Sequence, residues 1–334
     1  MLNVGVIGYG YWGPNLVRNF SRQEGCRVKW ISDTRGQRLE QAKKDHPFAA
    51  TTTDHTEILN DPATDAVIIA APVLLHYSIA KEALGKNKHV LIEKPMTSSV
   101  AQAQELIALA GRQNRTLMVD HTFLYTGAVR RIKTIIDSGE IGRLDYFDST
   151  RINLGLFQPD INVIWDLAPH DISILNFLVS EKPVSVSATG ISHTQNKLEN
   201  IAYLTLFYQN NFIAHFSCSW SSPVKIRKIL IGGSKKMILF DDVEPTEKVK
   251  IYDTGYSVKS DEEKHKILVD YRAGDIFIPK TEQREALDAV ADDFVSAIRD
   301  GRPPAADGQS GLEVVRILEA ADRSMRLNGK EIRL

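Results

Sequence analysis

The sequence is poor in cysteine, has no long apolar run and carries no surplus of either charge. Its 334 residues include two cysteines, Cys26 and Cys218, which are far apart and form no CxxC pair. This argues against a disulfide framework or a cysteine-rich zinc site and favours the reducing cytoplasm. The 41 Lys and Arg residues nearly balance the 42 Asp and Glu residues, whereas nucleic-acid binders usually carry a basic excess.

Membrane insertion and secretion are also not indicated. No apolar run approaches the roughly 18–20 residues that span a bilayer, and the first residues, MLNVGVIGYGYWG, lack the basic start of a signal peptide. The histidines outside the motifs below show no metal-ligand spacing with one another or with the cysteines. We therefore expect a cytoplasmic protein with no nucleic-acid partner, no membrane partner and no metal.

The composition and length are those of a folded protein with two domains. Hydrophobic residues make up 43% and charged residues 25% of the 334 residues. In the first 120 residues, short apolar runs alternate with helical patterns. The predicted strands cover residues 3–7, 28–32, 66–71, 89–92 and 116–119, and the predicted helices cover 14–21, 35–45, 77–84 and 100–112. This alternation predicts a parallel sheet covered by helices on both faces.

The pattern changes after about residue 122. The predicted helices there are 127–138, 166–178, 281–299 and 308–326, and the predicted strands are 184–192, 201–208, 212–220, 228–231 and 237–240. Successive strands joined by short turns predict a mainly antiparallel sheet. We therefore expect a doubly wound α/β dinucleotide-binding domain of the Rossmann type over residues 1–121. An α+β domain with a large, open, mainly antiparallel sheet should follow over residues 122–334.

The glycine turn after the first strand has the pattern GxGxxG. Gly8 permits a tight turn, Gly10 lets a pyrophosphate approach the backbone, and Gly13 lets the helix pack on the strand. Asp33 follows 20 positions after Gly13, at the end of the second strand. Its carboxylate would accept hydrogen bonds from ribose hydroxyls and repel a 2′-phosphate, which favours NAD over NADP. Arg35 weakens this preference, because a guanidinium binds phosphate.

Further cofactor contacts are expected beside these residues, from Tyr11, Trp12 and Thr34. The alternative interpretation of this segment is an ordinary strand–helix turn in which Asp33 caps a helix.

A lysine and an aspartate–histidine pair complete the candidate chemistry. Lys94 follows the predicted strand 89–92, at the sheet edge where ligands bind in such folds. Asp166 and His170 are four positions apart and share a helix face. Alcohol oxidation needs a hydride acceptor, a base such as histidine, and a cation to stabilise the alkoxide. The plainer alternatives are a solvated lysine and an aspartate that caps its helix.

Taken together, the segments GVIGYGYWG, AAP at 70–72, HVLIEKP and DLAPHD resemble the glucose–fructose oxidoreductase/inositol dehydrogenase (Gfo/Idh/MocA) family. The resemblance spans essentially the whole chain. It implies catalytic positions for Lys94, Asp166 and His170, and assembly as a homodimer or homotetramer through the C-terminal sheet. The cofactor contacts that it implies are Ala71, Pro72, His76, Glu93 and Lys94.

The sequence departs from many family members after the sixth strand, where DHTFLY at 120–125 replaces an Asn-x-Arg-Phe-like element. This makes a free inositol or simple sugar less expected. The segments YGYWGPNLVRNF and NVIWDLAPHDISIL are most similar to members acting on nucleotide-linked amino sugars. The implied reaction oxidises the 3-hydroxyl of UDP-N-acetylglucosamine or a relative. Predicted substrate contacts, with loop packing as their alternative, are His121, Phe123, Arg151, Asn153, Phe157, Gln158 and Trp165.

Three other functions stay open at this point. One is NADPH-dependent reduction of a nucleotide-linked keto sugar, which Arg35 favours and Asp33 disfavours. Another is an inositol or simple-sugar dehydrogenase. The third is a protein that only senses dinucleotides, although the presence of both Lys94 and His170 argues against it.

Overall fold

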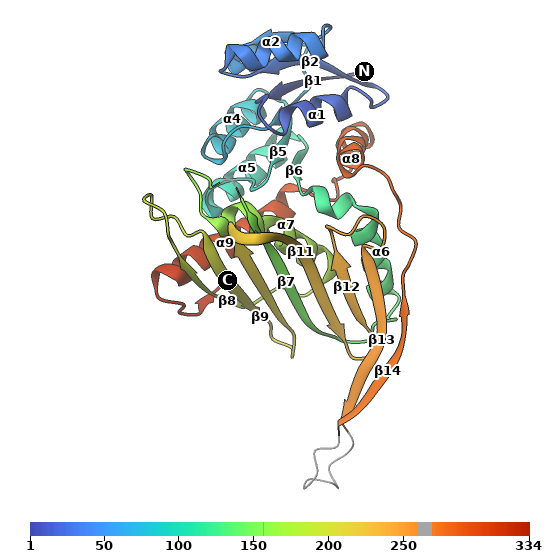
Figure 1. Cartoon of the computed structure of the whole chain (residues 1–334). Coiled ribbons are helices and arrows are strands. Elements are labelled where there is room, and N and C mark those ends of the chain that lie inside the picture. The colour runs from blue at the N-terminus through green and yellow to red at the C-terminus, as the bar shows by residue number, and fades with distance from the viewer. Residues whose placement is uncertain (156, 259–268) are drawn as a thin grey trace. The chain divides into compact units, whose positions relative to one another are not determined.

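The computed structural model describes residues 1–155, 157–258 and 269–334, which form two compact units (Figure 1). One unit contains residues 1–125 and 284–319, and the other contains residues 126–283 and 320–334. The sequence placed all residues after 121 in the second domain, whereas residues 284–319 pack within the first unit. Nonlocal contacts explain this, because Phe20 meets Phe294 with 6.0 Å between ring centroids and Gln23 donates to Asp288 over 2.7 Å.

The first unit is built on a six-stranded parallel sheet with the order β3-β2-β1-β4-β5-β6. Its strands are β1 (Leu2–Ile7), β2 (Cys26–Ser32), β3 (Ala50–Thr52), β4 (Ala66–Ile69), β5 (His89–Glu93) and β6 (Leu117–Asp120). Its helices are α1 (Gly13–Phe20), α2 (Gly36–Asp45), α3 (His55–Asn60), α4 (Val73–Gly85), α5 (Val100–Gln113), the short 3-10 helix η1 (Thr122–Tyr125) and α8 (Ala286–Asp300). The predicted doubly wound parallel sheet is confirmed.

The strands of this sheet are apolar because helices cover both of their faces. All four residues of β4 are buried, as are Val4 and Val6 of β1 and Leu91 of β5. The strand order reverses between β1 and β4. In such sheets the reversal opens a crevice at the carboxyl ends of the two strands, where ligands bind. The glycine turn after β1 and the Ala71-Pro72 turn after β4 flank this point.

The second unit contains a nine-stranded sheet with the order β14-β13-β12-β11-β7-β10-β9-β8-β15. Its strands are β7 (Leu144–Leu154), β8 (Ser185–Ile191), β9 (Ile201–Phe207), β10 (Ile213–Ser219), β11 (Ser221–Gly233), β12 (Met237–Asp241), β13 (Val249–Val258), β14 (Val269–Phe277) and β15 (Ile332–Arg333). Every neighbouring pair is antiparallel except β10 and β7. The predicted mainly antiparallel sheet is therefore confirmed.

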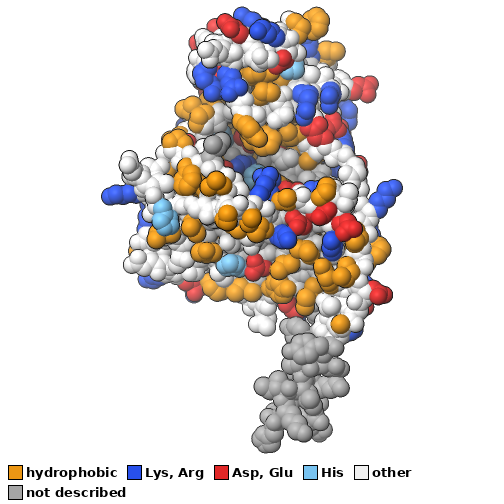
Figure 2. Space-filling view, in the orientation of Figure 1, with side chains coloured by type: hydrophobic (Ala, Val, Ile, Leu, Met, Phe, Trp, Pro, Cys, Tyr) orange, Lys and Arg blue, Asp and Glu red, His pale blue; other side chains and the backbone are white. Residues whose placement is uncertain are grey.

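Helices cover one face of this sheet, and among the described residues the other face is open (Figure 1). The helices are α6 (Gly127–Asp137), α7 (Val163–Leu178) and the end of α9 (Gly308–Arg326), which begins in the first unit. Outward-facing side chains include Tyr203, Ile213 and Leu230, which are 44–48% exposed. Figure 2 shows apolar side chains interspersed with charged ones over the strands of this sheet. No described helix is both long and apolar enough to cross a membrane.

Candidate functional site

The glycine turn between β1 and α1 cannot accommodate side chains at two of its positions. Gly8 has a φ of +102°, and a Cβ there would lie 2.3 Å from the carbonyl oxygen of Ala70. A Cβ on Gly13 would lie 2.3 Å from the carbonyl oxygen of Gly8. No side chain caps the start of α1, so its N–H groups suit an anion. The turn therefore fits the pyrophosphate of a dinucleotide.

Asp33, directly after β2, is 6% exposed and fully hydrogen-bonded. Its Oδ2 accepts from the backbone N–H of Tyr9 at 2.9 Å, and the Arg35 guanidinium binds both oxygens at 2.9 Å. Burial raises the pKa of Asp33, but the hydrogen bonds from Arg35 and Tyr9 outweigh burial and lower it overall. The carboxylate is thus held ionised as an acceptor. The Arg35 side chain is 57% exposed and reaches to within 3.5 Å of a Cβ built on Gly10.

His76 joins the two loops beside the sheet's reversal point. It is 1% exposed, and its Nδ1 and Nε2 lie 2.9 and 2.8 Å from the carbonyl oxygens of Pro95 and Ala71. Burial lowers the pKa of His76, with the nearby charge of Lys94 acting in the same direction. This histidine, predicted to lie along the cofactor, therefore also fixes the loop that follows Lys94.

Lys94 directly follows β5 and lies near the buried residues Asp120 and His121. Glu93, the last residue of β5, is paired in register with Asp120, the last residue of β6. Burial and the Asp120 charge raise the pKa of Glu93 well above its usual range. His121 is 1% exposed, and neither ring nitrogen has a hydrogen-bond partner among the described residues. Burial, together with the charge of Lys94, lowers the pKa of His121 to about 3.

The second unit carries Asp166 and His170 on α7. This helix begins at Val163 rather than at Asp166 as predicted, because Asn162 caps it by accepting from the backbone N–H of Trp165 at 3.3 Å. Asp166 therefore lies within the first turn, and its Oδ2 accepts from Trp220 Nε1 at 3.0 Å. Pro169 lies in the second turn of this helix.

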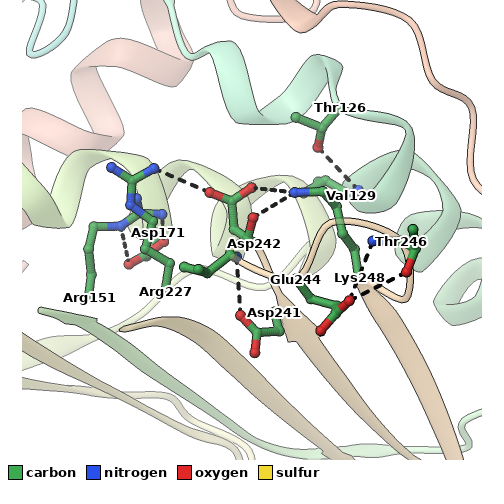
Figure 3. Close-up of polar contacts among 11 residues, drawn as sticks. Thr126, Val129, Arg151, Asp171, Arg227, Asp241, Asp242, Glu244, Thr246 and Lys248 are labelled. Atoms are coloured by element: carbon green, nitrogen blue, oxygen red, sulfur yellow. Dashed lines mark hydrogen bonds and ion pairs between the residues drawn. The ribbon is translucent and has the colours of Figure 1, made fainter. Parts of the chain in front are cut away.

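Arg151 lies under α7, where it forms a buried ion pair with Asp171 (Figure 3). Its Nε and Nη2 donate to Asp171 over 2.9 and 2.6 Å, and the Ser149 hydroxyl also donates to Asp171 at 2.8 Å. Arg151 and Asp171 are 3% and 2% exposed. Figure 3 also shows that Asp242 forms ion pairs with Arg227 and Lys248 nearby. The ion pair favours the packing interpretation of Arg151.

The other predicted substrate contacts include one buried residue and several exposed or partly exposed ones. Trp165 is 7% exposed and donates its indole N–H to Asp322 at 2.8 Å, which favours the packing interpretation. Phe157 is 43% exposed, with its ring 5.5 Å from that of Trp220. Phe123, Asn153 and Gln158 are partly exposed. For Phe157 and these three residues, a substrate contact stays a prediction.

Two residues that matter at the site were missed by the sequence analysis. They are Asp120, which faces Glu93, and Trp220, which holds Asp166. The sequence did hold a signal for Asp120. Glu93 and Asp120 each come directly after a predicted strand, 89–92 and 116–119. No local signal marks Trp220, because it is 54 positions from Asp166. Among the described residues, no group of three or more His, Cys, Asp or Glu is placed to hold a metal ion.

Comparison with known proteins agrees with this geometry. Residues 2–121 match the Gfo/Idh/MocA oxidoreductase family with an NAD-binding Rossmann fold, and residues 129–239 match the family's C-terminal domain. The chain belongs to the Gfo/Idh/MocA family. It is an oxidoreductase of the NAD(P)-dependent kind that this family comprises.

Several full-length relatives were found. An uncharacterised oxidoreductase, YrbE, of Bacillus subtilis is 25% identical over 96% of this chain and 93% of its own length. The UDP-N-acetylglucosamine 3-dehydrogenase of Acidithiobacillus ferrooxidans is 26% identical over 94% of each chain. The myo-inositol 2-dehydrogenase of Thermotoga maritima is 22% identical over 97% of this chain and 96% of its own. The fold matches aldose–aldose oxidoreductase from Caulobacter crescentus with a TM-score of 0.83, 18% identity and coverage of 100% and 99%.

Proposed function

We propose that the chain is an NAD-dependent dehydrogenase of a nucleotide-linked sugar. The substrate is UDP-N-acetylglucosamine or a close relative, and the hydroxyl at C3 is oxidised. The observation that carries the proposal is the position of Lys94 at the carboxyl end of β5, in a sheet whose β1 turn is shaped for a dinucleotide. The full-length likeness to a UDP-N-acetylglucosamine 3-dehydrogenase supports the substrate class.

The cofactor assignment rests on the residues around Asp33. The glycine turn leaves room for a pyrophosphate, and the ionised Asp33 is an acceptor for the adenosine ribose hydroxyls. When bound, NAD supplies the hydride acceptor. Arg35 must then release part of its contact with Asp33, and its exposed side chain leaves it free to move.

Three side chains take the chemical roles. His170 accepts the proton of the sugar hydroxyl, because an imidazole serves as a base near neutral pH. The Lys94 ammonium stabilises the developing alkoxide. Asp166, held by Trp220, orients the imidazole or binds a sugar hydroxyl. These roles come from the family positions of the three residues together with the local geometry of each.

We also propose that the protein is a homo-oligomer and that it is located in the cytoplasm. The open face of the nine-stranded sheet, with Tyr203, Ile213 and Leu230, is the surface through which two or four copies associate in the cytoplasm. Light scattering of the purified protein tests this directly. A monomer at micromolar concentration would contradict it.

One alternative reaction has a specific observation in its favour. Arg35 lies beside the ribose acceptor and its guanidinium would bind a 2′-phosphate, which fits an NADPH-dependent reductase of a nucleotide-linked keto sugar. The buried, ionised Asp33 opposes this by repelling the same phosphate. Likeness to a myo-inositol dehydrogenase supports a second alternative, a polyol substrate.

The test is NADH absorbance with a small substrate panel. The panel contains UDP-N-acetylglucosamine, its uronic acid relative, free N-acetylglucosamine, glucose and myo-inositol, each with NAD or NADP. Adding 2-oxoglutarate as an oxidant detects turnover when reduced cofactor stays bound. A signal only with nucleotide sugars and NAD is the expected result. A signal with free polyols, or with NADP alone, would overturn the assignment.

A further inference from the structure

The ends of β5 and β6 hold two carboxyl groups that have no part in the proposed proton transfer. Glu93 and Asp120 are paired in register on these neighbouring parallel strands. Side chains at such positions share a face of the sheet and lie about 4.8 Å apart. Burial and the negative charge of Asp120 raise the pKa of Glu93. A fully ionised carboxylate pair contains no donor with which the two groups could hydrogen-bond each other.

Among the described residues, one buried oxygen of this pair has no hydrogen-bond donor. Oδ1 of Asp120 accepts from the Thr122 hydroxyl at 2.6 Å, and Oε2 of Glu93 accepts from the backbone N–H of Lys94 at 3.2 Å. Oδ2 of Asp120 is buried and has no donor among the described residues. Two ionised carboxylates only accept, and a buried acceptor without a donor is costly. One proton on Glu93 supplies the missing donor.

The surrounding charges agree with a single proton. Lys94 is the cation that acts on both carboxyl groups. His121 beside it is neutral, since burial and the Lys94 charge lower its pKa to about 3. Tyr125 donates its hydroxyl to Asp293 at 2.7 Å, and burial first, then the Asp293 charge, raises its pKa. Two full negative charges would therefore lie side by side next to the Lys94 charge, whereas one negative charge balances it.

We propose that Glu93 and Asp120 share one proton and that their single remaining negative charge is the counter-ion that positions Lys94. This inference rests on the proposed role of Lys94. Glu93 and Asp120 act through Lys94 and are positioning residues. The arrangement holds the ammonium in place at the strand end, where it meets the substrate oxygen.

The shared proton has a spectroscopic signature in the cofactor-free protein. The infrared spectrum of the wild type at neutral pH should contain the C=O stretch of one buried, protonated carboxylic acid. Glu93→Gln and Asp120→Asn should each remove this band, because the new amide donates the hydrogen bond and leaves the other carboxyl ionised. Glu40→Gln, at an exposed helix position, is the matched control and should keep it. Absence of the band from the wild type, or its survival in both variants, would overturn the proposal.

Kinetics test the counter-ion role separately. Each single amide variant retains one negative charge beside Lys94 and should lower kcat by about tenfold or less. The double variant retains none, and its kcat should fall by at least about 1,000-fold, more than the product of the single effects. Losses that simply multiply would indicate two ionised carboxylates and contradict the proposal. Circular dichroism and a cooperative urea unfolding transition confirm that each variant is folded.

The Lys94→Ala variant distinguishes a failure of the proposed function from a failure of the counter-ion proposal. If this variant keeps its turnover, the proposed function of Lys94 fails while the infrared result still reports the shared proton. If Lys94→Ala is inactive and the double amide variant behaves as the wild type, the counter-ion proposal fails and the function stands.

Discussion

The indole N–H of Trp220 donates to Oδ2 of Asp166 across 3.0 Å, from the junction of β10 and β11 to the first turn of α7. Trp220 is 2% exposed, so its ring cannot rotate away without leaving a cavity. His170 follows one turn later on the same helix face. This hydrogen bond from the sheet therefore helps to orient the Asp166 side chain, one turn before His170 on α7.

Trp220→Phe tests this bond, because it keeps a buried ring and removes the N–H. A hydrogen bond to a charged group contributes about 1.5–3 kcal/mol, so kcat should fall by about tenfold or more, with the Kd of NAD unchanged. Trp30→Phe is the matched control, since Trp30 donates in the same way to Asp61 at 2.7 Å, away from α7. Equal kcat values for the two variants would contradict the role of Trp220.

Asp33→Ala should weaken NAD binding and relax discrimination against NADP. The substitution removes the ribose acceptor and the charge that repels a 2′-phosphate, and it frees Arg35 from its two 2.9 Å contacts. The measurement is the ratio of kcat/KM with NAD to kcat/KM with NADP. Asp54→Ala, which removes the cap of α3, is the control and should leave this ratio unchanged. A constant ratio in Asp33→Ala would refute the assignment of Asp33.

Arg151→Met should destabilise the second unit by about 3–5 kcal/mol, because it leaves the Asp171 charge buried without its partner. Adding Asp171→Leu should recover much of the loss, since no charge is then buried. The free energy of unfolding in urea measures both effects. Arg143→Met removes an ion pair with Asp145 at a 72% exposed side chain and should cost less than about 1 kcal/mol. Similar costs for the two arginines would contradict the structural role of Arg151.

The pH dependence of stability reports the protonated carboxyl at β5. Burial and the Asp120 charge raise the pKa of Glu93 above its unfolded value, so the folded protein binds the proton more tightly. This contribution is fully present below the unfolded pKa and is lost as pH rises through the folded pKa. The wild type should therefore lose stability relative to Glu93→Gln as pH rises above about 4.5, by at most about 1.4 kcal/mol per pH unit. A difference that is constant with pH would contradict the shift.

Much of the fold could be predicted because its signals are local. Buried strands such as β4 are continuous apolar runs, and the glycine turn needs glycines that sequence alone displays. Strand β7 was missed because its inward positions include Ser149 and Arg151, which hide the alternation of apolar residues. The three-residue β3 and six-residue α3 were too short to show a period.

The parts of the site that sequence did not predict depend on contacts between distant segments. Residues 284–319 join the first unit through α1, and Asp120 meets Glu93 only because β5 and β6 are neighbours. Arg151 is a predicted substrate contact with packing as the alternative, and its ion-pair partner Asp171 lies 20 positions further on. A local sequence pattern does not show which distant polar residue a buried polar side chain will pair with.

The central claim is that Lys94 enables NAD-dependent oxidation of a nucleotide-linked sugar. The most direct test is single-turnover NADH formation from UDP-N-acetylglucosamine and NAD, comparing the wild type with Lys94→Ala and measuring the Kd of NAD for both. The account predicts a burst of NADH in the wild type, none in Lys94→Ala, and nearly equal NAD affinity. NADH formation by Lys94→Ala at the wild-type rate would contradict it.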